Sequence, residues 1–509
     1  MACLFYDEGR RNVEHNKELN DKGGTFGSKE NLLVIIVMIF GVFVAILNET
    51  LLNVALPKIM EDIHIQPSTA QWLGTGYLLV IGILIPVTAF LIERFTTRAL
   101  FLSAMGLFTI GTFIAAVSPG FTVLLIGRVL QASGTGLLFP LLTNVVFAMV
   151  PLHKRGSAMG TIGIVITFAP AIGPTVSGII VEHYSWRILF YGVLPISLFV
   201  VIFAYLKLKN VTEVSRPSID LISLFLSTIG FGGMVYGFSS AGGEDVQWSS
   251  NGVWIPIVLG LVSLALFTWR QLTLAHPMLE LRTFKYPIFR LSTLIMMIVM
   301  MAMFSTMMLL SIFLQEGLGY SPLSTGLVML PGGILMGIMS PITGRLFDKF
   351  GAKWLAVTGL GLMAMTVGNF AFITLETPYF VIMILNTLFM LGISMLMMPV
   401  MTNALNQLPR PLYPHGTAII STLQQVSGAI GTALLIAVMS TGTERFLQKA
   451  SGGMASDPNL YNHAMTAGVK TAFLMAFGLI IIAWIIAFRI KRAVLESEVV
   501  AGLDNEGIV

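Results

Sequence analysis

Long apolar runs dominate the chain from residue 33 onward. Fourteen segments of predominantly apolar residues follow one another, separated by shorter polar stretches. A membrane-spanning helix needs about 20 such residues, so each segment is predicted to be one transmembrane helix. The predicted spans are residues 33–57, 71–92, 99–118, 122–149, 157–181, 188–206, 219–239, 253–272, 291–314, 323–343, 354–374, 379–405, 416–440 and 470–488.

The polar stretches between these spans predict the orientation of the chain. If the N-terminus is placed inside, 23 of the 29 Lys and Arg residues fall on the cytoplasmic side. Five others fall outside, and Arg128 lies within a span. Cytoplasmic loops carry an excess of Lys and Arg, so the sequence predicts cytoplasmic termini and an even number of spans. The largest outside segment is then 441–469.

Composition excludes several classes of function. Only 11% of the 509 residues are charged and 55% are hydrophobic, whereas soluble domains carry roughly 25% charged residues. A soluble enzyme is therefore not expected, and a net charge of +4 is too small to favour a nucleic-acid partner. The sequence contains no phosphate-binding G-x-x-x-x-G-K-[ST] loop, so we expect no use of ATP. With one cysteine and no clustered histidines, we expect neither a metal nor a cofactor.

The two halves of the chain resemble each other. The segment Ala89–Arg98 matches Gly344–Lys353, and Arg155-Gly-Ser-Ala matches His415-Gly-Thr-Ala, at nearly constant separation. These matches align spans 1–6 with spans 9–14, so the predicted all-α fold is two six-helix bundles with spans 7 and 8 inserted between them. The expected units are a tail at 1–31, a bundle at 32–206, the inserted pair with its linkers at 207–290, a bundle at 291–490 and a tail at 491–509.

Three spans also carry polar or proline-containing motifs. They are Leu47-Asn-Glu-Thr-Leu-Leu-Asn-Val-Ala-Leu-Pro57 in span 1, Arg128-Val-Leu-Gln-Ala-Ser-Gly134 in span 4 and Ala169-Pro-Ala-Ile-Gly-Pro-Thr-Val-Ser-Gly178 in span 5. With the loop at Gly344–Lys353, these motifs resemble those of the fourteen-span drug:proton antiporters of the major facilitator superfamily, which include quaternary-ammonium and multidrug exporters. Family members usually carry Asp where this chain has Asn48. The acid here stands at Glu49, which resembles the lincomycin-resistance branch.

The resemblance extends from residue 32 to about residue 490. It implies a major-facilitator-type transporter of a bacterial plasma membrane that is monomeric and has no enzymatic activity. Such a protein exchanges inward-moving protons for outward-moving lipophilic, often cationic drugs. The span 5 motif favours export over import, and its residues are Pro170, Gly173, Pro174 and Gly178. A generic helix-packing face is the alternative interpretation of that motif.

Glu49 and Arg128 are the predicted proton-coupling residues. Glu49 is the only acid well inside a span, and an intramembrane arginine requires a partner. Their depths in spans 1 and 4 are similar, so the two side chains could meet directly or through Gln131 or a water. Burial disfavours the carboxylate and a nearby arginine favours it, so alternating exposure could load and release a proton. A static ion pair that joins spans 1 and 4 is the alternative.

The expected substrate cavity lies between the bundles near the midplane of the membrane, because paired bundles place their solute site there. Spans 1, 2, 4 and 5 and their counterparts 9, 10, 12 and 13 should line it. The candidate polar and aromatic contacts are Asn48, Asn53, Trp72, Tyr77, Gln131, Asn144, Gln315, Asn403, Gln424 and Gln425.

The two basic-acidic loops are candidates for a conformational latch. An acid at a helix end beside cations can bridge to a neighbouring helix and stabilise one conformation. The candidate residues are Glu93, Arg94, Arg98, Asp348, Lys349 and Lys353. The alternative is a charge cluster that only sets membrane topology.

Two other functions remain open from the sequence. One is export of a single physiological solute such as a peptide, siderophore or nucleotide. The other is a membrane sensor or scaffold on a transporter fold, which would be expected to carry a large soluble domain or a long tail.

Overall fold

The structure is a computed structural model of the whole chain. It describes residues 29–65, 67–151, 154–211, 220–241, 250–274, 277–450 and 460–491. Most of the two predicted tails lies outside these ranges. The side chains of three expected site residues also lie outside the described set, and they are Asn53, Pro170 and Pro174.

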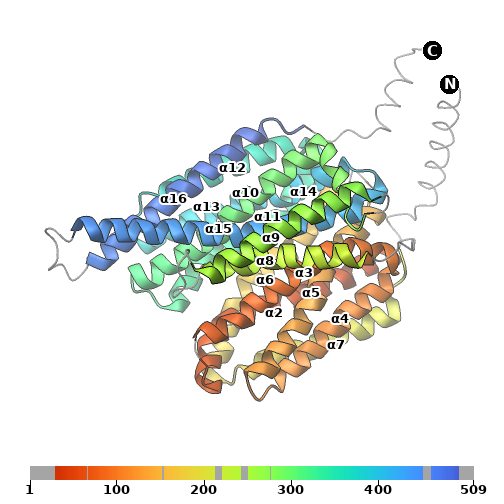
Figure 1. Cartoon of the computed structure of the whole chain (residues 1–509), viewed down its shortest axis with the longest axis horizontal. Coiled ribbons are helices and arrows are strands. Elements are labelled where there is room, and N and C mark those ends of the chain that lie inside the picture. The colour runs from red at the N-terminus through yellow and green to blue at the C-terminus, as the bar shows by residue number, and fades with distance from the viewer. Residues whose placement is uncertain are drawn as a thin grey trace, which may run out of the picture.

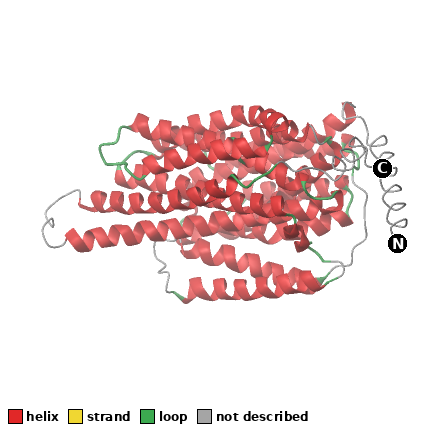
Figure 2. Cartoon of the chain, turned by 90° about the horizontal axis from the view of Figure 1, so that it is seen from above, coloured by secondary structure: helices red, strands yellow, loops and turns green. Residues whose placement is uncertain are grey.

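Every predicted span coincides with helix, and no strand occurs in the described ranges (Figure 2). The first half contains α2 (Lys29–Ile63), α3 (Pro67–Arg94), α4 (Thr97–Ala116), α5 (Phe121–Met149), α6 (Arg155–His183) and α7 (Arg187–Lys207). The inserted pair is α8 (Leu221–Ala241) and α9 (Asn251–Thr273). The second half contains α10 (Pro287–Ile312), α11 (Pro322–Phe350), α12 (Ala352–Phe370), α13 (Tyr379–Ser394), α14 (Met397–Asn406), α15 (Tyr413–Ala450) and α16 (Leu460–Ala487).

The helices form two groups that lie side by side (Figure 1). Helices α2–α7 pack mainly against one another and form the N-terminal bundle, and α10–α16 do the same in the C-terminal bundle. The bundles meet where α6 packs on α11 and where α15 packs on α3 and α5. The inserted helices α8 and α9 pack together, and α8 contacts both α3 and α15. The inserted pair therefore lies along one of the two seams between the bundles.

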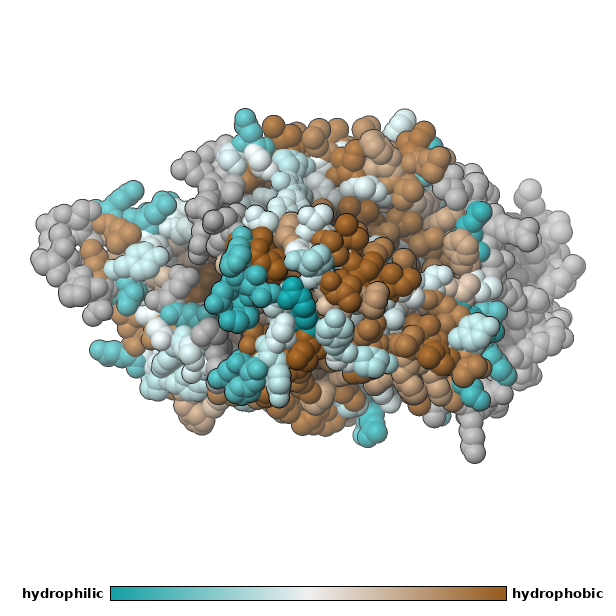
Figure 3. Space-filling model, turned by 90° about the horizontal axis from the view of Figure 1, so that it is seen from below, coloured by the Kyte–Doolittle hydropathy of each residue, from teal (hydrophilic) through white to brown (hydrophobic). Residues whose placement is uncertain are grey.

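Apolar side chains cover much of the surface, as expected for helices solvated by lipid (Figure 3). Helix α9 illustrates this best, because Trp254, Leu259, Leu266 and Trp269 all have about half or more of their surface exposed. Among the described residues, twelve helices are long and apolar enough to cross a membrane.

One span and one outside segment differ in detail from the prediction. The span expected at 379–405 is broken between α13 and α14, at Met395 and Leu396, three residues before Pro399. Proline lacks an N–H donor and clashes with the preceding turn, so Pro399 favours a break at this point without deciding it alone. The outside segment expected at 441–469 is largely helical, because α15 continues to Ala450 and α16 begins at Leu460. These extensions project beyond the other helices (Figure 1).

Candidate functional site

Arg128 of α5 is the centre of a hydrogen-bond network in the N-terminal bundle. Its guanidinium carbon lies 4.0 Å from the centroid of the Tyr77 ring on α3. Its Nη1 donates to Gln131 Oε1 at 3.1 Å, and its Nε donates to the Leu73 carbonyl at 3.4 Å. Only 1% of Arg128 is exposed. A buried cation needs such partners, so these contacts hold the guanidinium in one position.

A second shell of contacts orients the partners of this arginine. Gln131 Nε2 donates to Thr112 Oγ1 on α4 at 2.9 Å. The Tyr77 hydroxyl lies 2.8 Å from Thr135 Oγ1, which itself donates to the Gln131 carbonyl. The Tyr77 hydroxyl is therefore the donor in its contact with Thr135. Helices α4 and α5 approach closely enough for these bonds because both carry glycine where they cross.

Glu49 of α2 faces this network without a direct ion pair. Its carboxylate interacts electrostatically with both Arg128 and Tyr77. No nitrogen of Arg128 lies within 4.0 Å of a Glu49 oxygen, so the direct contact, one of the arrangements that the sequence left open, is not formed in this conformation. The neighbouring Asn48 is buried, and its side-chain nitrogen has no hydrogen-bond partner among the described residues.

The expected cavity residues do not form one cluster. Tyr77 and Gln131 meet in the network described above. Trp72 instead faces the inserted pair and stacks on Tyr236 of α8, with 5.5 Å between ring centroids. Gln315 is exposed on a π-helical turn, η3 (Phe313–Gly317), that follows α10.

The remaining amides lie in the two matching segments and on α15. Asn144 and Asn403 occupy equivalent positions near the C-terminal ends of α5 and α14, and both are buried. Asn403 Nδ2 donates to the Lys491 carbonyl at 3.1 Å, beyond the end of α16, so this amide joins helix ends. Gln424 and Gln425 are partly buried on α15, and the nitrogen of Gln424 has no partner among the described residues.

Asp348 links the two bundles. It stands near the C-terminal end of α11, and its carboxylate caps the first turn of α6. Oδ1 accepts from the Gly156 N–H at 2.9 Å, and Oδ2 accepts from the Ser157 N–H at 2.8 Å. A carboxylate is favoured at a helix N-terminus because unpaired N–H groups and the helix dipole both attract it. This contact supports the latch interpretation of the loop.

Glu93 makes the corresponding link on the other seam. Its Oε1 lies 2.8 Å from Nε2 of His415, in the first turn of α15. His415 Nδ1 accepts a hydrogen bond from the Glu280 N–H at 3.3 Å. The ring hydrogen is therefore on Nε2, which donates a hydrogen bond to Glu93 Oε1. Both acids of the two loops therefore cross between bundles.

The basic residues of the two loops contact groups within their own bundles. Arg98 donates to the Tyr205 carbonyl of α7 at 2.6 Å. The others lie over rings near them in the sequence: Arg94 over Phe90, Lys349 over Phe350 and Lys353 over Trp354. For Arg98, Lys349 and Lys353 the structure shows no contact across the seam in the described residues, in contrast to the two acids.

The span 5 motif packs on the helix that carries Glu49. Ser177 donates to the Leu51 carbonyl of α2 at 2.6 Å. A methyl group at Gly173 would lie 2.1 Å from Thr50 Oγ1, whereas one at Gly178 would meet no atom within 4 Å. The first half of the motif thus requires glycine for close approach to α2, and Gly178 does not.

We expect Gly173→Ala to impair the protein and Gly178→Ala to leave it unchanged. The added methyl at Gly173 overlaps a threonine next to Glu49, and such overpacking costs roughly 1–3 kcal/mol. The melting temperature in detergent should fall for Gly173→Ala and stay the same for Gly178→Ala. Equal behaviour of the two variants would contradict the assigned contact.

The model of the Major Facilitator Superfamily matches residues 38–432. The chain belongs to the major facilitator superfamily. It is 48% identical over 459 residues to the lincomycin resistance protein LmrB of Bacillus subtilis (strain 168), covering 90% of this chain and 95% of that protein. A multidrug resistance protein B homolog of Mycobacterium tuberculosis (strain CDC 1551 / Oshkosh) is 28% identical over 77% of this chain and 73% of its own.

A solved structure shares the fold of this chain. The crystal structure of the human organic anion transporter MFSD10 matches with a TM-score of 0.65 at 13% identity, covering 90% of this chain and all of that chain. In this superfamily context, the helices and relatives identify a multi-pass plasma-membrane protein with bacterial relatives. Among the described residues, no group of three His, Cys, Asp or Glu side chains could hold a metal.

One cluster between the bundles was not expected from the sequence. Arg155 of α6 donates through Nη1 to Asn406 Oδ1 at 3.1 Å and to the Tyr413 hydroxyl at 2.9 Å, both in the C-terminal bundle. Its Nη2 donates to the Phe147 carbonyl at 2.8 Å. The match between Arg155 and His415 in the internal repeat marked both positions, but nothing in the sequence indicated their partners.

Proposed function

We propose that the protein is a proton-coupled antiporter that exports lipophilic, often cationic drugs by alternating access. The observation that carries the proposal is the buried network of Arg128, Tyr77 and Gln131 in a bundle whose helix α2, which carries Glu49, packs against α5. A partly buried acid near a fixed cation can change its protonation when its surroundings change. Relatives named for lincomycin resistance and multidrug resistance support drugs as the exported class.

In the proposed cycle, proton and drug exchange takes place at Glu49, and the change of access takes place at the seams between the bundles. Glu49 takes a proton while it is open to the outside and releases it when the cavity opens inward. The deprotonated carboxylate then suits a cationic drug, so proton and drug compete for one site. The links of Asp348 to α6 and of Glu93 to His415 hold the bundles together at one end. Breaking and remaking these links accompanies each change of access.

We further propose fourteen spans, cytoplasmic termini and a monomeric protein with α8 and α9 as an inserted pair. The support is that each of the fourteen apolar segments coincides with helix, and that the excess of Lys and Arg falls on one side. On this topology, the two linked acids lie at the cytoplasmic side of the closed seams.

Export should confer resistance and depend on the proton gradient. Cells that produce the protein are expected to tolerate lincomycin and lipophilic cations better than cells with an empty vector. In inverted vesicles, energisation should drive uptake of both solutes, and a protonophore should abolish it. Resistance restricted to one solute would favour the single-solute exporter. Unchanged accumulation of every compound, with the protein present in the membrane, would contradict export.

A further inference from the structure

The C-terminal bundle repeats the helices that surround Arg128. In the internal repeat, α11 corresponds to α3, with equivalent residues 255 positions apart. This separation also aligns Pro86 with Pro341 inside the two helices. Tyr77, whose ring lies under the Arg128 guanidinium, therefore corresponds to Gly332. The aromatic support of the arginine has no side chain at the equivalent place in the C-terminal bundle.

Packing glycines identify the counterpart of Arg128 itself. Gly134 of α5 lies against the backbone of α4, and Gly392 of α13 lies against the backbone of α12. Arg128 precedes the first of these glycines by six residues, and Asn386 precedes the second by six. Asn386 therefore occupies the position in the C-terminal bundle that Arg128 occupies in the N-terminal bundle. The separation is 258 residues here and 259 residues between Pro140 and Pro399, and Pro399 lies beyond the break between α13 and α14.

The two equivalent positions differ in how their polar groups are satisfied. Arg128 has a ring, an amide and a carbonyl as partners. Asn386 is 0% exposed, and neither its side-chain nitrogen nor its oxygen has a hydrogen-bond partner among the described residues. Its Nδ2 lies 3.2 Å from the place where a Cβ of Gly332 would stand. An amide buried without partners is unfavourable in an apolar bundle, which makes it a candidate for function.

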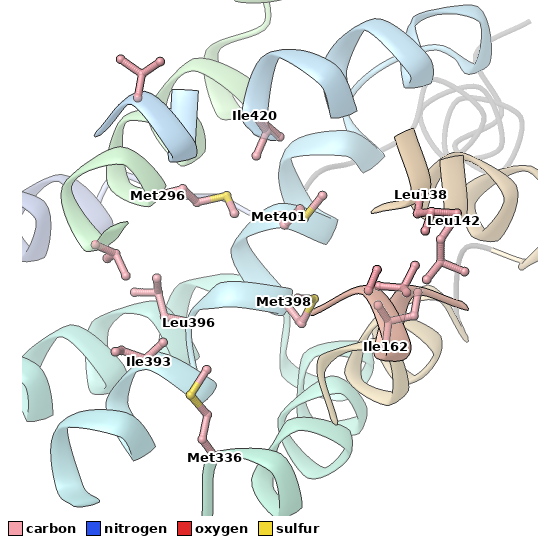
Figure 4. Packing of buried hydrophobic residues seen from close by; sticks show 14 of the residues in the cluster. Leu138, Leu142, Ile162, Met296, Met336, Ile393, Leu396, Met398, Met401 and Ile420 are labelled. Carbon is pink, nitrogen blue, oxygen red and sulfur yellow. The ribbon is translucent and has the colours of Figure 1, made fainter. Parts of the chain in front are cut away.

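The face of α13 that carries Asn386 is directed toward the interior of the C-terminal bundle. Asn386 lies two helical turns before Ile393, and Gly332 lies one turn before Met336. Figure 4 shows Met336 of α11 and Ile393 of α13 in the apolar centre that faces Ile162 of the other bundle. Asn386 and Gly332 continue this apolar surface toward the start of both helices.

We propose that Asn386, beside Gly332, is the solute-binding amide of the C-terminal bundle. It hydrogen-bonds a neutral hydroxyl or amide group of the exported solute, whose apolar part packs on the side chains around Met336. Positive charge on the solute is met by Glu49 in the opposite bundle. This inference rests on the proposed export, and it names the chemical class of solute: a lipophilic compound with a neutral hydrogen-bonding group.

The test compares Asn386→Leu with the wild type for two solutes. Lincomycin carries hydroxyl groups and an amide, whereas tetraphenylphosphonium has no hydrogen-bonding group. Loss of a hydrogen bond should raise the KM for lincomycin up to about tenfold at a nearly unchanged maximal rate. Binding of tetraphenylphosphonium to the purified protein should stay the same, and the melting temperature should not fall. Asn369→Leu is the matched control, because that amide is exposed on α12 and bonds to its own helix.

Gly332→Ala provides a second variant that retains the amide but displaces it. It should raise the KM for lincomycin, whereas Gly326→Ala on the same helix should not, because a methyl there meets no atom within 4 Å. An unchanged KM in a folded Asn386→Leu protein, or an equal loss for both solutes, would overturn the inference alone. A wild type that neither binds nor exports either solute would remove the proposed function and this inference with it.

Discussion

Replacing Glu49 by glutamine should reduce proton-driven export to the level of cells without the protein. Glutamine keeps the size and the hydrogen-bonding capacity of the side chain but cannot exchange a proton at any working pH. Without that exchange, a pH gradient has no coupling group inside the spans. The measurement is drug efflux from vesicles under an imposed pH gradient, and we expect no response to the gradient in the variant.

Binding separates loss of coupling from loss of folding. The Glu49→Gln protein should bind a neutral drug as the wild type does, because the network of Arg128, Tyr77 and Gln131 includes no hydrogen bond from Glu49. Glu61→Gln is the matched control on the same helix, since Glu61 is exposed and pairs with Lys58. Gradient-driven efflux that persists undiminished in Glu49→Gln would exclude Glu49 as the coupling site.

Replacing Asp348 by asparagine should slow turnover while leaving drug affinity nearly intact. The carboxylate accepts hydrogen bonds from two backbone N–H groups at the start of α6. Asp348 stands near the C-terminal end of α11, far from the middle of that helix. Hydrogen bonds to a charged group contribute about 1.5–3 kcal/mol, so its loss should shift the balance between closed and open seams by roughly 30-fold. A cysteine at Ser340, which faces Gly163 across the seam, should then react faster with a thiol reagent.

Asp220→Asn is the matched control for this shift. Asp220 accepts two hydrogen bonds from Arg270, at 2.8 and 2.9 Å, but both residues belong to the inserted pair. The Arg270 guanidinium lowers the pKa of the Asp220 carboxyl to about 2. The stabilisation is present above the ordinary pKa and is lost only as the pH falls through about 2, so it persists at every transport pH.

Asp220→Asn should therefore lower the melting temperature without changing the reactivity of the cysteine at Ser340. Normal turnover of Asp348→Asn, with unchanged labelling, would leave Asp348 with a role in topology alone.

The positions of the helices could be predicted from the sequence, but the break in one of them could not. Runs of about 20 apolar residues suffice to predict helices in lipid, because every backbone group must be satisfied within the segment. The break between α13 and α14 could not be placed from the apolar run. Pro140, the counterpart of Pro399, stands inside an unbroken α5, so proline alone does not decide it.

The candidate site was predicted in part. Glu49 and Arg128 are identifiable from the sequence because charged groups within spans are costly and therefore rare. Tyr77 and Gln131 do lie beside Arg128. Trp72 lies on α3 five residues before Tyr77, which is more than one helical turn. Its ring therefore stacks on Tyr236 of α8 and does not lie beside Arg128.

The sequence by itself determined where the helices lie, that they repeat, and which acids and cations stand out. Only the tertiary structure decided which faces meet: that Asp348 caps α6, that Arg155 reaches Tyr413 and Asn406, and that the Asn386 amide has no hydrogen-bond partner among the described residues. The physical reason is the solvent. In water, an apolar stripe shows which face of a helix is buried, but in lipid both the core and the outer face are apolar. The rotation of each helix about its axis is then set by packing with its neighbours.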